Sequence, residues 1–250
     1  MNSMNRKIGI GVLWNLLSLF ITRGASTVFT LFLARLLVPE AFGLVAMATI
    51  VFELANIFVN SGLGTALIQS KTISDKDINT VFYTNVLLSM IAYAAIFTSS
   101  SYVADFYAQP DLTLIIKVTG LIVLFNAVRV VQTALCSRKM DFKSLMKSNV
   151  VSIVISGCLA VAAAWYGLGV WSLVIQMVSS SLISAFVLWF ISPWRPSVEF
   201  SVESFTRLFR FAKNLLAEGL LEVLFKNSYI LVIGRFLALK QQGYTFLRRK

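Results

Sequence analysis

Residues 168–191 read LGVWSLVIQMVSSSLISAFVLWFI, a long run without a single charged side chain. A helix of about 20 apolar residues is long enough to cross the hydrocarbon core of a bilayer. This run therefore predicts a membrane-spanning helix. Its serines and its glutamine predict one helix face that is turned away from lipid, because polar side chains are costly in hydrocarbon.

Further apolar runs of similar length occur along the whole chain. Together, the candidate spans are residues 8–33, 42–64, 80–102, 112–135, 149–166, 168–191 and 209–233. The 250 residues are 58% hydrophobic and 13% charged. Soluble domains are about 45–50% apolar and about 25% charged. The sequence therefore predicts an all-α polytopic membrane protein.

Several classes of function are disfavoured by the residues that the chain lacks. Histidine is absent, which excludes His-dependent nucleophilic catalysis and imidazole metal sites. Cys136 and Cys158 have no CxxC spacing, so we expect no metal site and no disulfide framework. The net charge of +11 is spread over loops and not gathered in one aromatic-rich patch. We therefore expect no nucleic-acid partner, no cofactor and no enzymatic activity.

The loops predict which way the chain crosses the membrane. Basic residues crowd the loops after the fourth and sixth spans: Arg138, Lys139, Lys143 and Lys147, then Arg195, Arg207, Arg210 and Lys213. Such loops favour the cytoplasmic side. The loop after the third span carries only Asp105 and Asp111, and the turn at 166–169 is uncharged. Both fit the opposite side, which predicts a cytoplasmic N-terminus.

Polar side chains recur every three or four residues in four spans, so each row lies on one helix face. The rows are Asn15, Ser18, Thr22, Ser26 and Thr30 with Arg23 beside them; Thr49, Glu53, Asn56 and Asn60; Ser172, Gln176, Ser180 and Ser184; and Asn214, Glu218, Glu222 and Lys226. Such rows can simply be helix contacts. A charge inside a span costs about 2.5–3.5 kcal/mol, which favours a hydrated cavity or pairing for the ionisable groups.

The fourth span carries Arg129, with Asn126 and Thr133 near it at helical spacing. In the first six spans, the cationic candidates for a cavity lining are Arg23 and Arg129, and the acidic candidate is Glu53. This excess of cations suits an anionic headgroup, of which phosphate or pyrophosphate is the obvious kind.

A weak internal repeat accompanies these rows. Three residues near the end of the first span recur at a constant offset of 200 after the seventh: Arg35, Leu37 and Gly43 against Arg235, Leu237 and Gly243. Repeated halves are typical of transporters, so the seventh span is expected to open a second half. We expect residues 1–200 to form a six-helix lobe and 201–250 to begin another.

The order of short segments along the chain carries a family resemblance. They are LARLL at 33–37, FG at 42–43, GLGTALIQ at 62–69, ADFY at 104–107, RKMDFK at 138–143, GVWSL at 169–173, SPWRP at 192–196 and IGRF at 233–236. With these segments the chain resembles the polysaccharide transporters, the Wzx-type flippases, of the MOP superfamily. Members of this family are roughly twice as long, so the chain is expected to be an incomplete form.

The resemblance implies a MATE-like helical bundle in the bacterial inner membrane. Its implied activity is to move undecaprenyl-pyrophosphate-linked oligosaccharide repeat units between leaflets by alternating access of two six-helix lobes. The implied partners are the lipid-linked oligosaccharide, membrane lipids, and the polysaccharide polymerase and chain-length machinery. One lobe plus one helix cannot alternate around a central cavity, so we expect the 250 residues alone not to restore export.

Roles follow from side-chain chemistry rather than from a matched motif. We expect Arg23 and Arg129 to neutralise the pyrophosphate. The hydrogen-bonding side chains of the polar rows would replace the hydration of the sugar, and the candidates are Asn15, Asn56, Asn60 and Gln176. Carboxylates would bind a coupling proton or sodium ion, and the candidates are Glu53, Glu218 and Glu222.

Two alternatives remain open. A MATE-like antiporter that exports organic cations shares the repeated halves, although it would favour an acidic, aromatic cavity. A nonfunctional fragment is the second alternative. A membrane polymerase or acyltransferase is disfavoured, because the outward loops are short and histidine is missing.

Overall fold

The computed structural model describes residues 3–59, 62–70, 72–210, 212–215, 217–218, 221 and 225. Among these residues all regular structure is helical. The helices are α1 (Ser3–Leu36), α2 (Pro39–Val59), α3 (Leu63–Gln69), α4 (Asp75–Tyr107), α5 (Leu112–Arg138), α6 (Phe142–Trp165) and α7 (Trp171–Ile191). Six of them are long and apolar enough to cross a membrane, all except α3. The prediction of an all-α polytopic membrane protein is confirmed.

The second predicted span, 42–64, is wrong at its end. Helix α2 ends at Val59, and the short α3 begins only after Gly62. Gly62 has φ of 74°, a left-handed conformation that glycine adopts without strain. A Cβ on Gly62 would lie 2.9 Å from the side chain of Leu215, so the break is also a point of close approach. The seventh predicted span, 209–233, lies largely outside the described residues, as does the repeat segment at 235–243.

Local residues explain the tight turns between helices. Pro39 is the first residue of α2, where its missing N–H costs nothing, and it disfavours helical conformation in the residue before it. Glu40 follows in the first turn, where a negative charge complements the helix dipole. Between α6 and α7, Gly167 has φ of 77°, which lets the chain reverse within a few residues.

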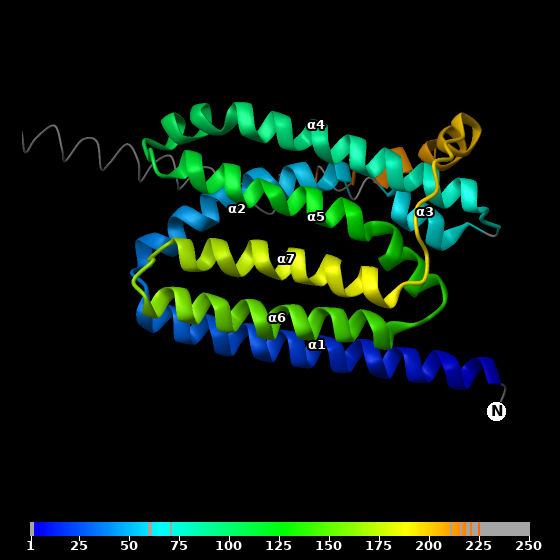
Figure 1. The fold of residues 1–250 in the computed structure, drawn as a ribbon, viewed down its shortest axis with the longest axis horizontal. Helices are drawn as coiled ribbons and strands as arrows, with labels where there is room; N and C mark the ends of the chain where they lie inside the picture. The colour runs from blue at the N-terminus through cyan, green and yellow to red at the C-terminus, as the bar shows by residue number, and fades with distance from the viewer. Residues whose placement is uncertain are drawn as a thin grey trace, which may run out of the picture.

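The long helices lie side by side and alternate in direction (Figure 1). Helix α1 packs on α6, α6 on α7, α7 on α5, and α5 on both α4 and α2. Close approach depends on small residues: Gly157 of α6 receives the ring of Phe29 of α1, with no room for a Cβ. Because α1 and α2 pack on different neighbours, they diverge from their shared turn, and α5 connects the two sides of the bundle.

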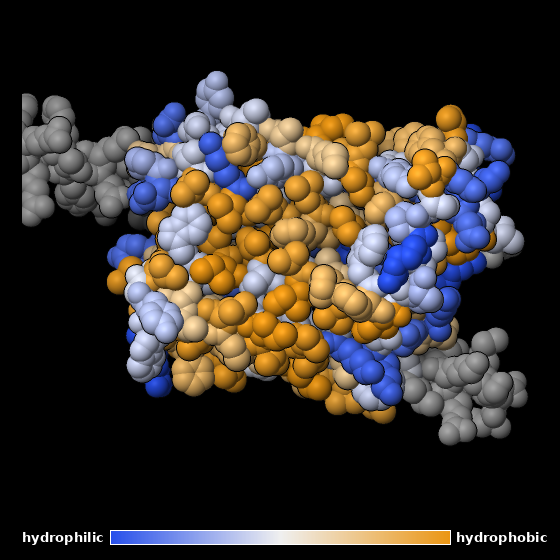
Figure 2. Space-filling model, viewed as in Figure 1, coloured by the Kyte–Doolittle hydropathy of each residue, from blue (hydrophilic) through white to orange (hydrophobic). Residues whose placement is uncertain are grey.

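The outer surface matches a bilayer. Figure 2 shows hydrophobic atoms across the middle of the face on which α7 lies, with hydrophilic atoms toward both ends. Large apolar side chains are exposed there, for example Phe186 and Phe190 of α7. The loops after α5 and α7 lie at the same end of the bundle, on the right in Figure 1. This is the end at which the sequence concentrates basic residues.

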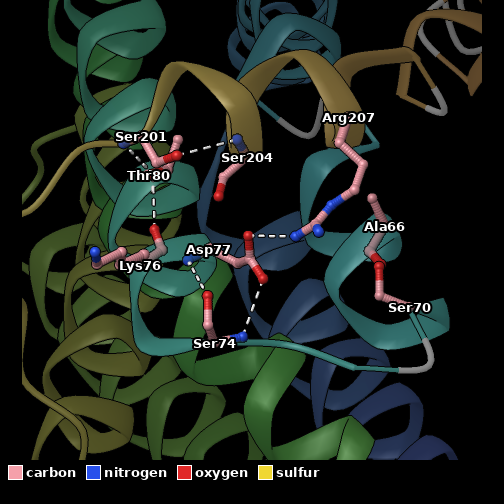
Figure 3. A network of polar contacts seen from close by, with 9 residues as sticks. All are labelled: Ala66, Ser70, Ser74, Lys76, Asp77, Thr80, Ser201, Ser204 and Arg207. Carbon is pink, nitrogen blue, oxygen red and sulfur yellow. Dashed lines mark hydrogen bonds and ion pairs between the residues drawn. The ribbon is translucent and has the colours of Figure 1, made fainter.

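The chain leaving α7 is fastened to the first turn of α4, and we call residues 192–210 the strap. Ser74 and Asp77 form a capping box at the start of α4. The same Asp77 carboxylate accepts a hydrogen bond from Nη2 of Arg207 at 2.5 Å, in the helical part of the strap (Figure 3). Asp77 is 3% exposed at its side chain whereas Arg207 is 57% exposed, so the carboxylate is the buried partner.

Two more buried residues of α4 hold the strap. Asn79 Nδ2 donates to Ser197 Oγ at 2.6 Å, and Ser197 N donates to Asn79 Oδ1 at 3.1 Å. Thr80 Oγ1 accepts from Ser201 N at 3.0 Å (Figure 3). The bonds to Ser197 satisfy the amide of Asn79, which would otherwise be buried without partners. The strap is thus packed on the bundle that precedes it in the chain.

Candidate functional site

Helix α5 positions the polar residues at the centre of the bundle. Asn126, Arg129 and Thr133 lie on α5 at spacings of three and four, so they share one face. That helix contacts α2, α3, α4, α6 and α7. A polar face on α5 can therefore reach side chains from several helices that are distant in sequence.

Arg129 is hydrogen-bonded to a serine of α7, which is in turn bonded to a serine of α6. Its Nη1 donates to Ser184 Oγ of α7 at 2.7 Å. Ser184 Oγ lies 3.0 Å from Ser148 Oγ of α6, and Ser148 Oγ also lies 2.9 Å from the Ser184 carbonyl oxygen, to which it donates. Within the described residues, Arg129 makes no ion pair with a carboxylate. Its positive charge is oriented by hydroxyl groups and is not neutralised by them.

Asn126 makes a second junction one turn away. Its Nδ2 donates to Asn56 Oδ1 of α2 at 3.0 Å. Its Oδ1 accepts from Ser181 Oγ of α7 at 2.9 Å. Because both ends of the amide are bonded to different helices, its orientation is determined by the network. Asn126 thereby links α2, α5 and α7 beside the guanidinium.

Two hollows open on either side of this pair. The central cleft, of about 410 Å³, lies between α1, α2, α5, α6 and α7. Its lining is Thr22, Phe52, Ile122, Asn126, Arg129, Asn149, Ser152, Ile153, Met177, Ser180, Ser181 and Ser184. The α3 hollow, of about 380 Å³, is lined by Gly64, Thr65, Ile68, Asn126, Arg129, Val130, Thr133 and Ala134. Asn126 and Arg129 line both, so one cation faces two hollows that have polar side chains in their lining.

The α3 hollow contains an unusual hydroxyl. Thr133 Oγ1 is buried and has no hydrogen-bond partner among the described protein atoms. Buried polar atoms are normally paired, and an unpaired one calls for water, an ion or a functional explanation. Thr133 lines this hollow, so its hydroxyl is a candidate hydrogen-bond donor or acceptor for a polar molecule bound there.

The structure brings together only some of the predicted site residues. Arg129 and Asn56 take part in the network described above. Glu53 and Gln176 are half-buried on α2 and α7, but neither lines the two hollows. Asn60 and Glu222 lie outside the described residues.

The predicted residues at the two ends of the chain are exposed. Arg23 and Asn15 are exposed along α1, although Thr22 of the same row lines the central cleft. Glu218 is also exposed. No described contact of these three residues identifies a role, and their assignments stay predictions.

Sequence reasoning missed Ser148, Asn149 and Ser181. All three lie next to the network or line the central cleft. The available signal was the frequency of serine in α6 and α7, which we could not distinguish from ordinary small-residue helix contacts. Only the packing of α6 and α7 on α5 shows which serines belong to the polar network and which are ordinary helix contacts.

Comparison with known proteins places this arrangement in context. A family profile described as "Polysaccharide biosynthesis protein" matches residues 32–246. The succinoglycan biosynthesis transport protein ExoT of Rhizobium meliloti is 26% identical over 96% of this chain and 48% of its own length. The lipopolysaccharide biosynthesis protein WzxC of Escherichia coli is 26% identical over 94% of this chain and 48% of its own length.

A third relative comes from another organism. The teichuronic acid biosynthesis protein TuaB of Bacillus subtilis is 24% identical over 76% of this chain and 40% of its own length. The chain thus spans about half the length of the curated relatives it matches. No solved structure matches it significantly.

Proposed function

This chain belongs to the polysaccharide biosynthesis protein family, and we propose that it serves in the export of lipid-linked oligosaccharide repeat units across the cytoplasmic membrane. The substrate would be an undecaprenyl-pyrophosphate-linked oligosaccharide. The single observation that best supports this proposal is the guanidinium of Arg129, which lines two hollows together with other polar side chains and has no carboxylate partner in the described part of the chain.

The chemistry of the hollows suits such a substrate. A pyrophosphate that leaves the headgroup region needs a fixed cation, and arginine presents a planar fork of donors that matches phosphate oxygens. Ser184 fixes the guanidinium through one nitrogen, which leaves the other donors for a ligand. The hydroxyl and amide groups around the central cleft would replace water around the sugar.

The membrane arrangement forms part of the same proposal. The end of the bundle that carries the basic loops would face the cytoplasm, with the N-terminus on that side. Residues 1–200 would form one lobe, and residues from 201 onward would begin the second. The exposed polar row of α1, with Asn15 and Arg23, would then face the space between lobes, and Glu53 or Glu218 would bind a coupling ion.

Binding of the pyrophosphate group tests the proposal directly. The purified chain in nanodiscs would be titrated with undecaprenyl pyrophosphate and, separately, with undecaprenol. We expect Arg129→Gln to weaken pyrophosphate binding by about 10- to 100-fold, the equivalent of a hydrogen bond to a charged group of about 1.5–3 kcal/mol. Equal binding of the two lipids, or unchanged binding by the variant, would contradict the proposal.

Lys117 provides a matched control on the same helix. Its ammonium lies 4.5 Å from the centre of the Phe97 ring and lines neither hollow. Lys117→Gln removes the same charge from α5 as Arg129→Gln. We expect it to leave pyrophosphate binding unchanged. An equal loss in both variants would assign the effect to net charge and not to the site around Arg129.

A further inference from the structure

A third hollow, of different character, lies between α5 and α7. It measures about 390 Å³, and its lining is apolar except at one end. On α7, its residues Leu182, Phe186 and Phe190 lie on the side of the helix away from Ser181 and Ser184, which face the central cleft. This α5–α7 groove therefore opens toward the lipid side of the bundle and is separate from the cleft.

The groove has the dimensions and surface of a chain-binding site. From Leu182 to Phe190, α7 rises about 12 Å, which matches a stretch of extended hydrocarbon. Leu182, Phe186 and Phe190 are 46%, 62% and 72% exposed, and Phe125 and Val128 of α5 form the opposite wall. The rings of Phe186 and Phe190 pack edge to face, with 4.6 Å between their centroids, so this side of the groove is preformed.

A cation lies at the end of the groove where headgroups are expected. The Arg195 guanidinium lies 5.6 Å from the centre of the Trp189 ring. Its Nη1 donates to the carbonyl oxygens of Ser192 at 2.6 Å and Trp194 at 2.8 Å. In the described part of the chain it makes no ion pair, although Asp75 and Glu199 line a neighbouring hollow with it, so no carboxylate contacts it directly in place of an anion. Arg195 follows α7 at the end of the bundle that carries the basic loops.

We infer that the α5–α7 groove binds an anionic phospholipid of the bilayer. One acyl chain lies along α7 from Phe190 toward Leu182, and the phosphate contacts Arg195. Charge complementarity selects an anionic headgroup, since a basic residue at the membrane surface attracts anionic lipids. The position of the groove selects a bilayer lipid over a transported substrate, because the groove lies on the far side of α7 from the central cleft. This inference does not depend on the proposed export function.

Quenching of Trp189 fluorescence by brominated lipids tests this site. In the test variant, phenylalanine replaces the other tryptophans: Trp14, Trp165, Trp171 and Trp194. The full chain is reconstituted with dibrominated phosphatidylglycerol or dibrominated phosphatidylcholine. We expect phosphatidylglycerol to be preferred at Trp189 by about fivefold, the ratio for one basic residue near an anionic headgroup.

Two charge variants show whether the lipid preference arises from binding in the groove or from the general surface potential. Arg195→Gln should reduce the preference to about one. Lys139→Gln removes an exposed charge at the same end of the bundle and should leave the preference intact. A variant that keeps only Trp165 reports on the last residue of α6, at the opposite end of the bundle from Arg195. It should show no preference for phosphatidylglycerol. If the tryptophan-depleted chain does not fold, native mass spectrometry of the otherwise unaltered chain makes the same comparison.

Three results would overturn the inference. The first is equal quenching by the two lipids at Trp189. The second is a preference that survives Arg195→Gln, or that Lys139→Gln abolishes equally, because either would indicate surface potential. The third is displacement of phosphatidylglycerol by an equal mole fraction of undecaprenyl phosphate, which would make the lipid carrier the occupant instead.

Discussion

Replacing Arg129 by methionine should weaken pyrophosphate binding by about 10- to 100-fold, as for Arg129→Gln, with little or no loss of protein stability. The charge within a membrane span costs about 2.5–3.5 kcal/mol. Its hydrogen bond to Ser184 returns about 1.5–3 kcal/mol. The difference predicts that Arg129→Met is between about 0.5 kcal/mol less stable and about 2 kcal/mol more stable. Ser184 keeps Ser148 as a partner in the variant, so no new buried group is orphaned.

The assay pairs thermal unfolding in detergent with binding of undecaprenyl pyrophosphate. Ser184→Ala is the opposite perturbation, because it retains the charge and removes its acceptor. We expect it to destabilise the protein by about 1.5–3 kcal/mol. If Arg129→Met instead lowered the free energy of unfolding by about 3–5 kcal/mol, the guanidinium would be required for the stability of the bundle. That result would refute the reasoning for a ligand site.

Other perturbations test the packing, the strap and the topology. Gly157→Ala should destabilise the α1–α6 contact by about 1–3 kcal/mol in thermal unfolding, because the added Cβ overlaps an aromatic ring of α1. Gly24→Ala, where a Cβ meets nothing within 4 Å, should be neutral or stabilising, and a similar loss there would refute the steric argument. Asp77→Asn should speed hydrogen exchange of the strap amides by up to about fivefold, since ion pairs with an exposed partner contribute about 0.2–1 kcal/mol. Unchanged exchange would mean that the hydrogen bonds of Asn79 and Thr80 are sufficient to hold the strap. A reporter fused after Lys143 should read cytoplasmic and one near Gln109 periplasmic, whereas the opposite result at both would invert the orientation.

Hydropathy along the chain was sufficient to predict the membrane class and the six long helices, with each end within seven residues of its observed position. Apolar runs such as 168–191 are local properties, and a helix that satisfies its own backbone is the expected structure for them in lipid. The same reasoning joined α2 to α3, because a left-handed glycine at position 62 leaves little trace in an apolar run. Local patterns therefore predict helices well and breaks within them poorly.

The polar site was only partly predictable. Arg129 and Asn56 could be identified because a charged or amide side chain in a span is costly and stands out on a helix face. Ser184 belonged to a predicted polar row, but its hydrogen bond to Arg129 was not predicted, and Ser148 was not identified. Ser184 lies 55 positions after Arg129, and Ser148 lies 36 positions before Ser184. Serine is also common in α6 and α7.

The α5–α7 groove and the strap lie beyond any sequence pattern that we used. Both depend on how far each helix is rotated about its axis and which neighbour it meets, and these are set by the fit of many side chains at once. The composition of a span determines that it enters the bilayer, because burial of apolar surface is additive along the chain. Whether a particular face, such as that of Arg129, meets a serine, a hollow or lipid depends on packing between distant segments, and the tertiary structure alone decides it.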